Sequence, residues 1–180
     1  MQVDMKYQAG LLCFREGPVV VNLYREFANK RPDIKLDLIL TDGSGEWHPR
    51  GCGLSSFVGD ELKMPVVGVF KNFLKIGSDY EGDEVVEDAR LKCKNFGDYI
   101  VLDHVIKNGT HVRCAVMKTM NTRNFDPIYI TPGNLCDFDS AIRIVKSLCK
   151  QREPEPLRLA DRISRKYIDE KTNRFRYTPG

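Results

Sequence analysis

Two short acidic motifs each place one carboxylate beside glycine at the edge of an apolar segment. Glu16 lies in the sequence FREGP, residues 14–18, and Asp42 lies in LTDGSG, residues 40–45. Isolated carboxylates at strand ends are typical ligands of hard cations such as Mg²⁺, which bind a small number of oxygen ligands from protein. His48 follows Asp42 by six positions. The pattern therefore indicates a metal-assisted site that acts on phosphate.

Apolar runs precede Asp42 and Lys71, and they predict the strands that must position both residues. Residues 36–41 and 64–70 read as buried strands, and residues 51–62 between them read as a helix. An alternation of strand, helix and strand indicates parallel pairing. We therefore expect the Asp42 carboxylate and the Lys71 ammonium to emerge near the same edge of a sheet.

The remaining elements follow from periodicity and turn signals. Val19, Leu23 and Phe27 recur at helical spacing after a proline that suits a first helical turn. Asn-Gly at 108–109, between two β-rich runs, is a strong hairpin signal. The further predicted elements are helices over 18–30, 139–150 and 158–168, a loop with a short helix over 77–95, hairpin strands over 99–106 and 111–118, and a strand over 128–130.

The composition is that of an ordinary globular protein. The chain has 180 residues, 42% hydrophobic and 29% charged, and we expect a single domain over 1–180. No apolar run is long enough to span a membrane, and the first residues lack the apolar core of a secretion signal. Six cysteines without a CxxC pair favour reduced thiols over a zinc site or a disulfide scaffold. These features predict a cytoplasmic or nuclear protein without membrane contact.

Positive charge gathers near the C-terminus. The formal net charge is +3, which by itself favours a nucleic-acid partner only weakly. Residues 151–180 form a basic tail that contains eight Lys and Arg residues and five acidic residues. Such a tail can neutralise phosphates, and a solvated tail without a partner is the alternative interpretation.

Several segments, in order along the chain, resemble the endonuclease V family. The match runs from about Tyr7 to Arg165, and because separate motifs agree in register, the chain is identified as a member of that family. The segments are residues 7–18, which resemble a tyrosine wedge followed by GLLAFREGP, 37–53, which resemble DGHG…HPRGFG, 67–71, which resemble GVAKK, 129–133, which resemble YVSVGH, and 153–161, which resemble PEPxRxAD.

The resemblance implies both a fold and an activity. It implies an α/β fold like that of ribonuclease H, a mixed sheet with flanking helices and with acidic residues at its centre. It also implies cleavage of a phosphodiester one bond to the 3′ side of inosine, in DNA or RNA, with Mg²⁺ as the metal and Mn²⁺ as a possible substitute. Such an enzyme would serve nucleic-acid repair or the handling of deaminated adenosine.

The resemblance further implies roles for four catalytic residues. Glu16 and Asp42 would bridge Mg²⁺ ions, which activate a water and stabilise the leaving oxygen. Lys71 would hold a phosphate or the attacking water, and His48 would contact the phosphate or position water. The alternatives are a lysine that merely ends a strand and a structural histidine that is hydrogen-bonded to a loop.

The same resemblance implies contacts with the nucleic acid. Tyr7 would insert beside the lesion and fill the gap left by a base that has turned out of the stack. Gly10 and Leu12 would form part of the base pocket, where backbone groups can read the hypoxanthine edge. Arg15 and Arg50 complete the predicted nucleic-acid-binding residues.

The chain departs from the family pattern in three places. No DVSY-like strand precedes the wedge, so the family's first metal-binding aspartate has no counterpart and the sheet is expected to be N-terminally truncated. Lys6 and Ala9 replace two wedge prolines, and Asn134 replaces the histidine of the VGH segment. We expect Asp139, in preference to Asp137, to supply a late carboxylate to the metal.

These departures leave two functions open. The chain is either an endonuclease or a catalytically impaired short form that binds inosine or nucleic acid. A different nuclease of the same fold is a third interpretation, and the FREGP and PEPxRxAD segments speak against it. A missing central strand would expose strand edges, which invite pairing and lower the stability relative to a full-length relative.

Overall fold

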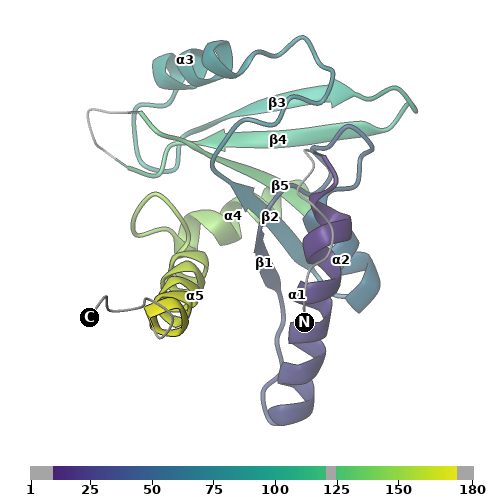
Figure 1. Ribbon diagram of the computed structural model, residues 1–180. Helices are drawn as coiled ribbons and strands as arrows, with labels where there is room; N and C mark the ends of the chain where they lie inside the picture. The colour runs from purple at the N-terminus through teal and green to yellow at the C-terminus, as the bar shows by residue number, and fades with distance from the viewer. Residues whose placement is uncertain (1–9, 121–124, 174–180) are drawn as a thin grey trace, which may run out of the picture.

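The protein is built on a mixed five-stranded sheet with the strand order β1-β2-β5-β4-β3 (Figure 1). The computed structural model describes residues 10–120 and 125–173. The strands are β1 (Ile39–Asp42), β2 (Val66–Phe70), β3 (Tyr99–Val105), β4 (His111–Met117) and β5 (Ile128–Asn134). β1 and β2 are parallel and the other neighbours are antiparallel. The predicted mixed sheet with flanking helices is confirmed.

The parallel pair sets the geometry of the predicted site. Asp42 pairs with Val69 in the β1–β2 register, so Asp42 and Lys71 both emerge at the C-terminal ends of their strands. The crossover between the strands is α2 (Leu54–Leu62). Gly68 permits a close approach at this point, because a Cβ there would lie 2.3 Å from the carbonyl oxygen of Gly43.

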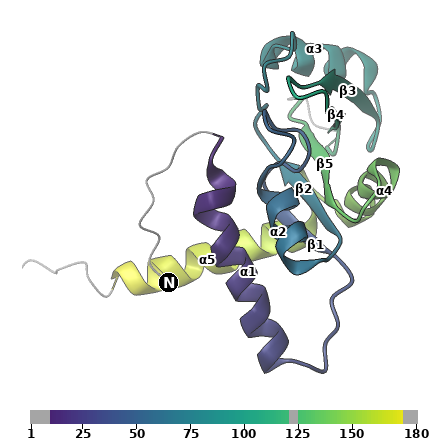
Figure 2. The same cartoon turned by 90° about the vertical axis from the view of Figure 1, so that its right-hand side faces the viewer.

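Helices cover both faces of the sheet (Figure 2). Alternate residues of a strand point to opposite faces. Val66 of β2 packs in a cluster with residues of α1 (Leu12–Lys30) and α2, whereas Val67 packs in a cluster with residues of α4 (Phe138–Leu148). The cluster beneath α3 (Gly82–Lys92) fills the first of these two faces near β3 and β4.

The first helix begins earlier than predicted. α1 starts at Leu12 and contains Pro18, so Glu16 lies within the helix rather than ahead of it. Pro18 has no N–H to donate, but Gly17 lets the helix pack directly on α2, since a Cβ at Gly17 would lie 2.3 Å from the ring of Phe57. This tertiary contact accounts for a helix that continues through the proline.

The apolar face predicted for α1 is not the face that is buried. Cys13, Gly17 and Val21 are the buried residues of the helix, whereas the side chain of Leu23 is 66% exposed. Small residues therefore make the contact with α2, and the stripe that contains Leu23 is left without a complete covering.

Most of the basic tail folds as a single long helix, α5 (Glu155–Asn173). It begins before the predicted helix over 158–168 and ends after it. Ion pairs within the helix join Arg158 to Glu155 at 2.8 Å and Arg165 to Asp161 at 2.9 Å, so some of its positive charge is neutralised locally.

Across the described ranges, no helix has the length and apolar character needed to cross a membrane.

Candidate active site

Hydrogen bonds on both sides of Asp42 fix the end of β1. The Thr41 and Ser55 hydroxyl oxygens lie 2.5 Å apart, and Ser55 Oγ also donates to the Gly43 carbonyl at 3.0 Å. The Gly43 N–H donates to the carbonyl of Val69 at 3.2 Å. The backbone that carries Asp42 is thereby held by α2 and β2, and such support keeps a functional carboxylate in one orientation.

Lys71 lies between two carboxylates. Its Nζ is 3.7 Å from Asp42 Oδ2 and 3.3 Å from Glu153 Oε2. The Asp42 side chain is 61% exposed, so one side of it reaches solvent. On the other side the surrounding protein removes water and raises the pKa of Asp42; Lys71 opposes this shift, and Glu153 adds to it. A carboxylate in this setting gains from a bound cation.

Sequence reasoning assigned no chemical role to Glu153 or to Asp161, whose charge also raises the pKa of Asp42. Both residues belong to the PEPxRxAD-like segment, more than 80 residues beyond Lys71. The motif signalled the family, but only the folded chain brings it to the ends of β1 and β2.

A pocket of about 380 Å³ opens beside Asp42. Asp42, Lys71 and the apolar side chains of Phe70, Phe73 and Leu74 line it. Apolar walls with a few convergent polar groups are typical of sites that bind a small organic molecule. Of the residues predicted for the site, the structure brings together Gly10, Leu12, Asp42, His48 and Lys71 in the walls of this one pocket.

His48 is buried, and both of its ring nitrogens are occupied. Nε2 lies 3.1 Å from the Gly10 carbonyl oxygen, and Nδ1 accepts from the backbone N–H of Arg50 at 3.2 Å. Because Nδ1 is an acceptor, Nε2 carries the proton and donates it to Gly10. Burial first, and then the charge of Arg50, lower the pKa of His48. These bonds favour the structural alternative for His48 over contact with phosphate or water.

Arg50 holds the same Gly10 carbonyl from outside the pocket. A guanidinium nitrogen of Arg50 donates to the Gly10 carbonyl, and the guanidinium carbon lies 5.8 Å from the centre of the Phe14 ring. The side chain of Arg15 is 3.9 Å from Glu16. Neither arginine lines the pocket.

Glu16 lies on α1 next to the pocket but does not line it. It follows Cys13, a lining residue, by three positions, and residues at that spacing are neighbours on a helix surface. The Glu16 side chain is 45% exposed. The structure thus places one predicted carboxylate in the pocket and the other on the helix that contributes to its wall.

The prediction that Asp139 supplies a metal ligand beside Asp42 is wrong. β5 runs antiparallel to β2, and its last residue, Asn134, pairs with Val66 at the start of β2. Asp139, in the first turn of α4, therefore follows the end of the sheet opposite to Asp42. In residues 10–120 and 125–173 no three or more His, Cys, Asp or Glu side chains are grouped so that they can hold a metal ion.

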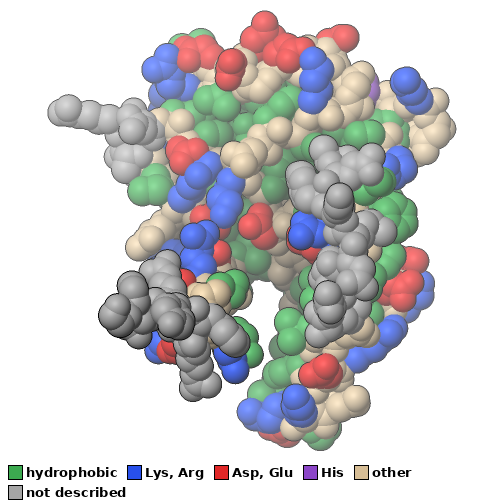
Figure 3. All heavy atoms as spheres, in the orientation of Figure 1, with side chains coloured by type: hydrophobic (Ala, Val, Ile, Leu, Met, Phe, Trp, Pro, Cys, Tyr) green, Lys and Arg blue, Asp and Glu red, His purple; other side chains and the backbone are tan. Residues whose placement is uncertain are grey.

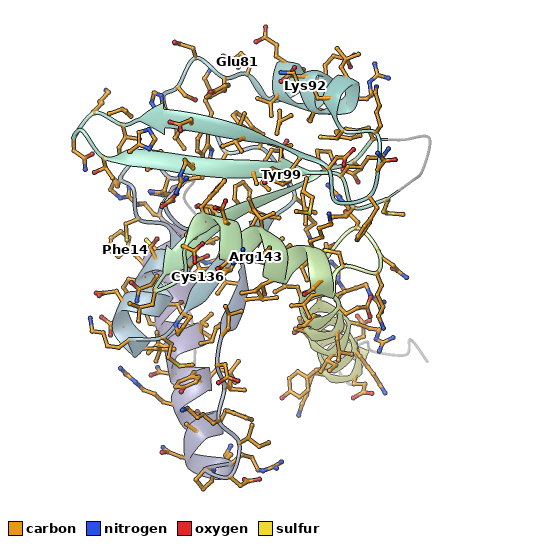
Figure 4. The ribbon with its side chains drawn as sticks, turned by 180° about the vertical axis from the view of Figure 1, so that it is seen from behind. Phe14, Glu81, Lys92, Tyr99, Cys136 and Arg143 are labelled. Atoms are coloured by element: carbon orange, nitrogen blue, oxygen red, sulfur yellow. The ribbon has the colours of Figure 1, made fainter. Side chains whose placement is uncertain are left out.

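The view from behind shows the helix whose first turn contains Asp139. Cys136 and Arg143, which bracket Asp139 in the sequence, lie at α4 on the face turned toward the viewer in Figure 4. The side-chain amide nitrogen of Asn134 donates to the carbonyl of Gly59 at 2.8 Å, so this residue ties β5 to α2. The predicted wedge residue Tyr7 lies outside the described residues.

The chain that carries this pocket has clear relatives among known proteins. The sequence profile of the Endonuclease V family matches residues 1–162. The chain belongs to the Endonuclease V family. It is 31% identical to endonuclease V of Mus musculus over 162 residues, which are 90% of this chain and 46% of the mouse protein. It is 33% identical to endonuclease V of Dictyoglomus thermophilum, covering 93% of this chain and 64% of that protein.

Solved endonuclease V structures share the fold. Human ENDOV superimposes with a TM-score of 0.83 at 30% identity, over 94% of this chain and 69% of the human chain. A D234N endonuclease V from Ciona intestinalis, in complex with a 23mer DNA containing an inosine followed by a ribo-adenosine, gives a TM-score of 0.81 at 26% identity, over 94% of this chain and 70% of that chain. The chain thus spans about half to two thirds of the curated relatives and somewhat more of the solved ones.

The donor chemistry of the site fits a hard cation. Mg²⁺ is commonly held by one or two carboxylates together with substrate phosphates and waters. The Asp42 carboxylate would supply one oxygen ligand, and a bound cation would favour its charged form against the raised pKa. Glu16 on α1 is the candidate for a second ligand. Mn²⁺ accepts the same ligands.

Proposed function

We propose that this chain carries the catalytic site of a metal-dependent endonuclease that cuts a strand one bond to the 3′ side of inosine. The observation that carries the proposal is the position of Asp42 in the wall of the pocket, 3.7 Å from Lys71. The family assignment and the likeness to a Ciona enzyme in complex with inosine-containing DNA support it.

Each residue has a stated task in the proposed reaction. Asp42 and Glu16 hold the cation, and Lys71 holds a non-bridging oxygen of the scissile phosphate. When bound, the cation lowers the pKa of a water and stabilises charge on the leaving oxygen. His48 keeps the Gly10 segment in place, and the pocket between Gly10 and Phe73 receives the hypoxanthine ring.

The proposal extends to DNA and RNA strands, to Mg²⁺ or Mn²⁺, and to a single domain over residues 1–180 that acts in the cytoplasm, the nucleus or both. Arg50 and Arg15 lie beside the Gly10 segment and Glu16, where a strand that enters the pocket would bring its phosphates. Phosphate contacts of this kind position a strand without reading its sequence.

A second function, binding inosine without cutting, is favoured by one observation. Of the carboxylates predicted to hold the cation, Asp42 lines the pocket whereas Glu16 and Asp139 do not, and a single lining carboxylate leaves the cation few fixed ligands against the phosphate. The alternative keeps the pocket and the arginines but assigns them to recognition alone.

A nicking assay separates the two functions. Labelled DNA and RNA strands with one inosine, and matched strands with guanosine instead, are incubated with the chain in Mg²⁺, in Mn²⁺ and in EDTA. Metal-dependent cutting one bond beyond inosine, lost in Asp42→Asn, supports the endonuclease. Selective binding without cutting under all conditions supports the recognition module, and equal treatment of inosine and guanosine strands contradicts both.

A further inference from the structure

The Lys71 ammonium donates a hydrogen bond to Glu153 and not to Asp42. Lys71 Nζ lies 3.3 Å from Glu153 Oε2, whereas its 3.7 Å separation from Asp42 Oδ2 is too long for a hydrogen bond. The Glu153 and Lys71 side chains are 24% and 31% exposed, so solvent screens their pair less than it screens a pair on the open surface. The ammonium is thus held on the side of Glu153.

The segment that carries Glu153 is fixed to three strands of the sheet through its neighbour Arg152. One guanidinium nitrogen of Arg152 donates to the Lys71 carbonyl at 3.2 Å and to the Pro127 carbonyl at 3.3 Å. The Thr119 hydroxyl donates to the Arg152 carbonyl at 2.7 Å. These partners lie at the ends of β2, β5 and β4. Arg152 therefore holds the backbone of Lys71, and the next residue, Glu153, holds its ammonium.

Without Glu153, the ammonium would turn to Asp42. Among the described residues, Glu153 and Asp42 supply the two carboxylates within ion-pair distance of Lys71 Nζ. The four-carbon stem of lysine is flexible, and an ammonium that donates directly to a carboxylate lies about 2.7–2.9 Å from it. Lys71 can thus close on Asp42 by a movement of about 1 Å. In that position it would repel a cation from the same carboxylate oxygens.

We propose that Glu153 is a positioning residue that holds the Lys71 ammonium off Asp42. Asp42 then keeps its oxygens available to a cation. Lys71 has three N–H donors, of which Glu153 takes one, so another stays available to a phosphate oxygen. The benefit to the cation and to the phosphate rests on the proposed function, whereas the effect of Glu153 on the position of Lys71 does not.

Loss of negative charge is the rival explanation for any effect of a Glu153 substitution. In the space-filling view, basic and acidic side chains lie against one another just above α5, so charges of both signs are close together (Figure 3). The charge of Glu153 also raises the pKa of Asp42, which shows that the two carboxylates act on each other. The test must therefore separate the contact with Lys71 from the charge of Glu153.

The first measurement is a pair of crystal structures without metal, of the unaltered chain and of Glu153→Met. Methionine has about the length of glutamate but offers neither a charge nor a carboxylate. The separation of Lys71 Nζ from the nearer Asp42 oxygen should shorten from 3.7 Å to a hydrogen-bond distance. Glu155→Met is the matched control, because this carboxylate lies two residues further on and pairs with Arg158 at 2.8 Å; it should leave the separation unchanged.

The second measurement is the affinity for Mn²⁺ without nucleic acid, followed by electron paramagnetic resonance. Glu153→Met should weaken Mn²⁺ binding at least about 10-fold, because Lys71 then competes for Asp42. In a Lys71→Met background the same substitution should weaken binding by no more than about 3-fold, the effect of the lost charge alone. Circular dichroism of each variant establishes that it folds.

Three results would overturn the inference. They are a Lys71–Asp42 separation that stays unchanged in Glu153→Met, an unchanged Mn²⁺ affinity in that variant although the unaltered chain binds Mn²⁺, or a loss of affinity of the same size with and without Lys71. A shortened separation in a chain that never binds Mn²⁺ supports the positioning role and counts against the proposed endonuclease, so the two failures are distinguishable.

Discussion

His48 Nε2 donates to the carbonyl oxygen of Gly10 at 3.1 Å, and this bond joins two motifs 38 residues apart. Because Nδ1 accepts from the backbone of Arg50, the ring serves as a neutral bridge between the HPRG loop and the start of α1. Burial and the nearby Arg50 lower the pKa of His48, so the ring stays neutral under ordinary conditions. A histidine held in this way positions a pocket rather than carrying a proton.

Replacing His48 should therefore lower activity without changing its pH dependence. We expect His48→Gln to reduce inosine-specific cleavage about 10- to 100-fold, because small displacements of a binding segment are costly. The measurement is the rate of cleavage against pH, with His104→Gln as the control. If the rate profile of His48→Gln lost a limb near the usual histidine pKa, the histidine would be a proton carrier instead.

Lys71 should shift the acidic limb of the profile of cleavage rate against pH. Burial raises the pKa of Asp42, and Lys71 counteracts some of that shift. The reaction needs the charged carboxylate, so activity falls as the pH drops through this raised pKa. Lys71→Met removes the opposing cation and should move the acidic limb to higher pH, in addition to lowering the maximum rate. Lys75→Met is the control, and an unchanged limb in Lys71→Met would show that the Lys71 charge does not act on Asp42.

The charged Asp42 carboxylate should lower the free energy of unfolding at neutral pH. Its pKa in the folded chain is raised above the ordinary value, so the folded state binds the proton more tightly than the unfolded state. The penalty is absent below the ordinary pKa, grows as the pH rises toward the raised pKa and is complete above it. Asp42→Asn should thus have an equal or higher free energy of unfolding at pH 7, measured by urea denaturation. Asp37→Asn, at an exposed position, serves as control, and a less stable Asp42→Asn would contradict the sign.

The DGSG loop should tolerate no side chain at Gly45. A Cβ there would lie within van der Waals radii of the backbone carbonyl of Pro132, which cannot move without distorting β5. Gly45→Ala should cost about 1–3 kcal/mol of unfolding free energy. Gly82→Ala, where the nearest atom would be 3.4 Å away, should be neutral or slightly stabilising. Equal unfolding free energies for the two variants would show that the loop is more adaptable than its packing indicates.

Local patterns predicted the regions of the fold that depend on local chemistry. Apolar runs before Asp42 and Lys71 predicted the parallel pair, and Asn108-Gly109 predicted the β3–β4 hairpin, in which Gly109 has φ of 83°. The continuation of α1 through Pro18 could not be predicted, because it depends on a contact with α2 that the local sequence does not contain.

The site likewise divides into features that local sequence predicted and features that depend on tertiary contacts. Asp42, His48 and Lys71 lie together in one pocket as the motifs predicted. Asp139 was placed wrongly because spacing along the chain does not reveal that β5 runs antiparallel to β2. Glu153 lies just before α5, and it was missed as a partner of Lys71 because only the completed sheet brings this part of the chain beside β1.

The central claim is that the Asp42 carboxylate holds the cation that makes cleavage possible. The most direct test compares cleavage and binding of an inosine-containing strand by the unaltered chain and by Asp42→Asn in Mg²⁺. The structure predicts that Asp42→Asn loses at least about 100-fold in cleavage rate while binding the strand with nearly unchanged affinity. Cleavage by Asp42→Asn at the rate of the unaltered chain would contradict the claim.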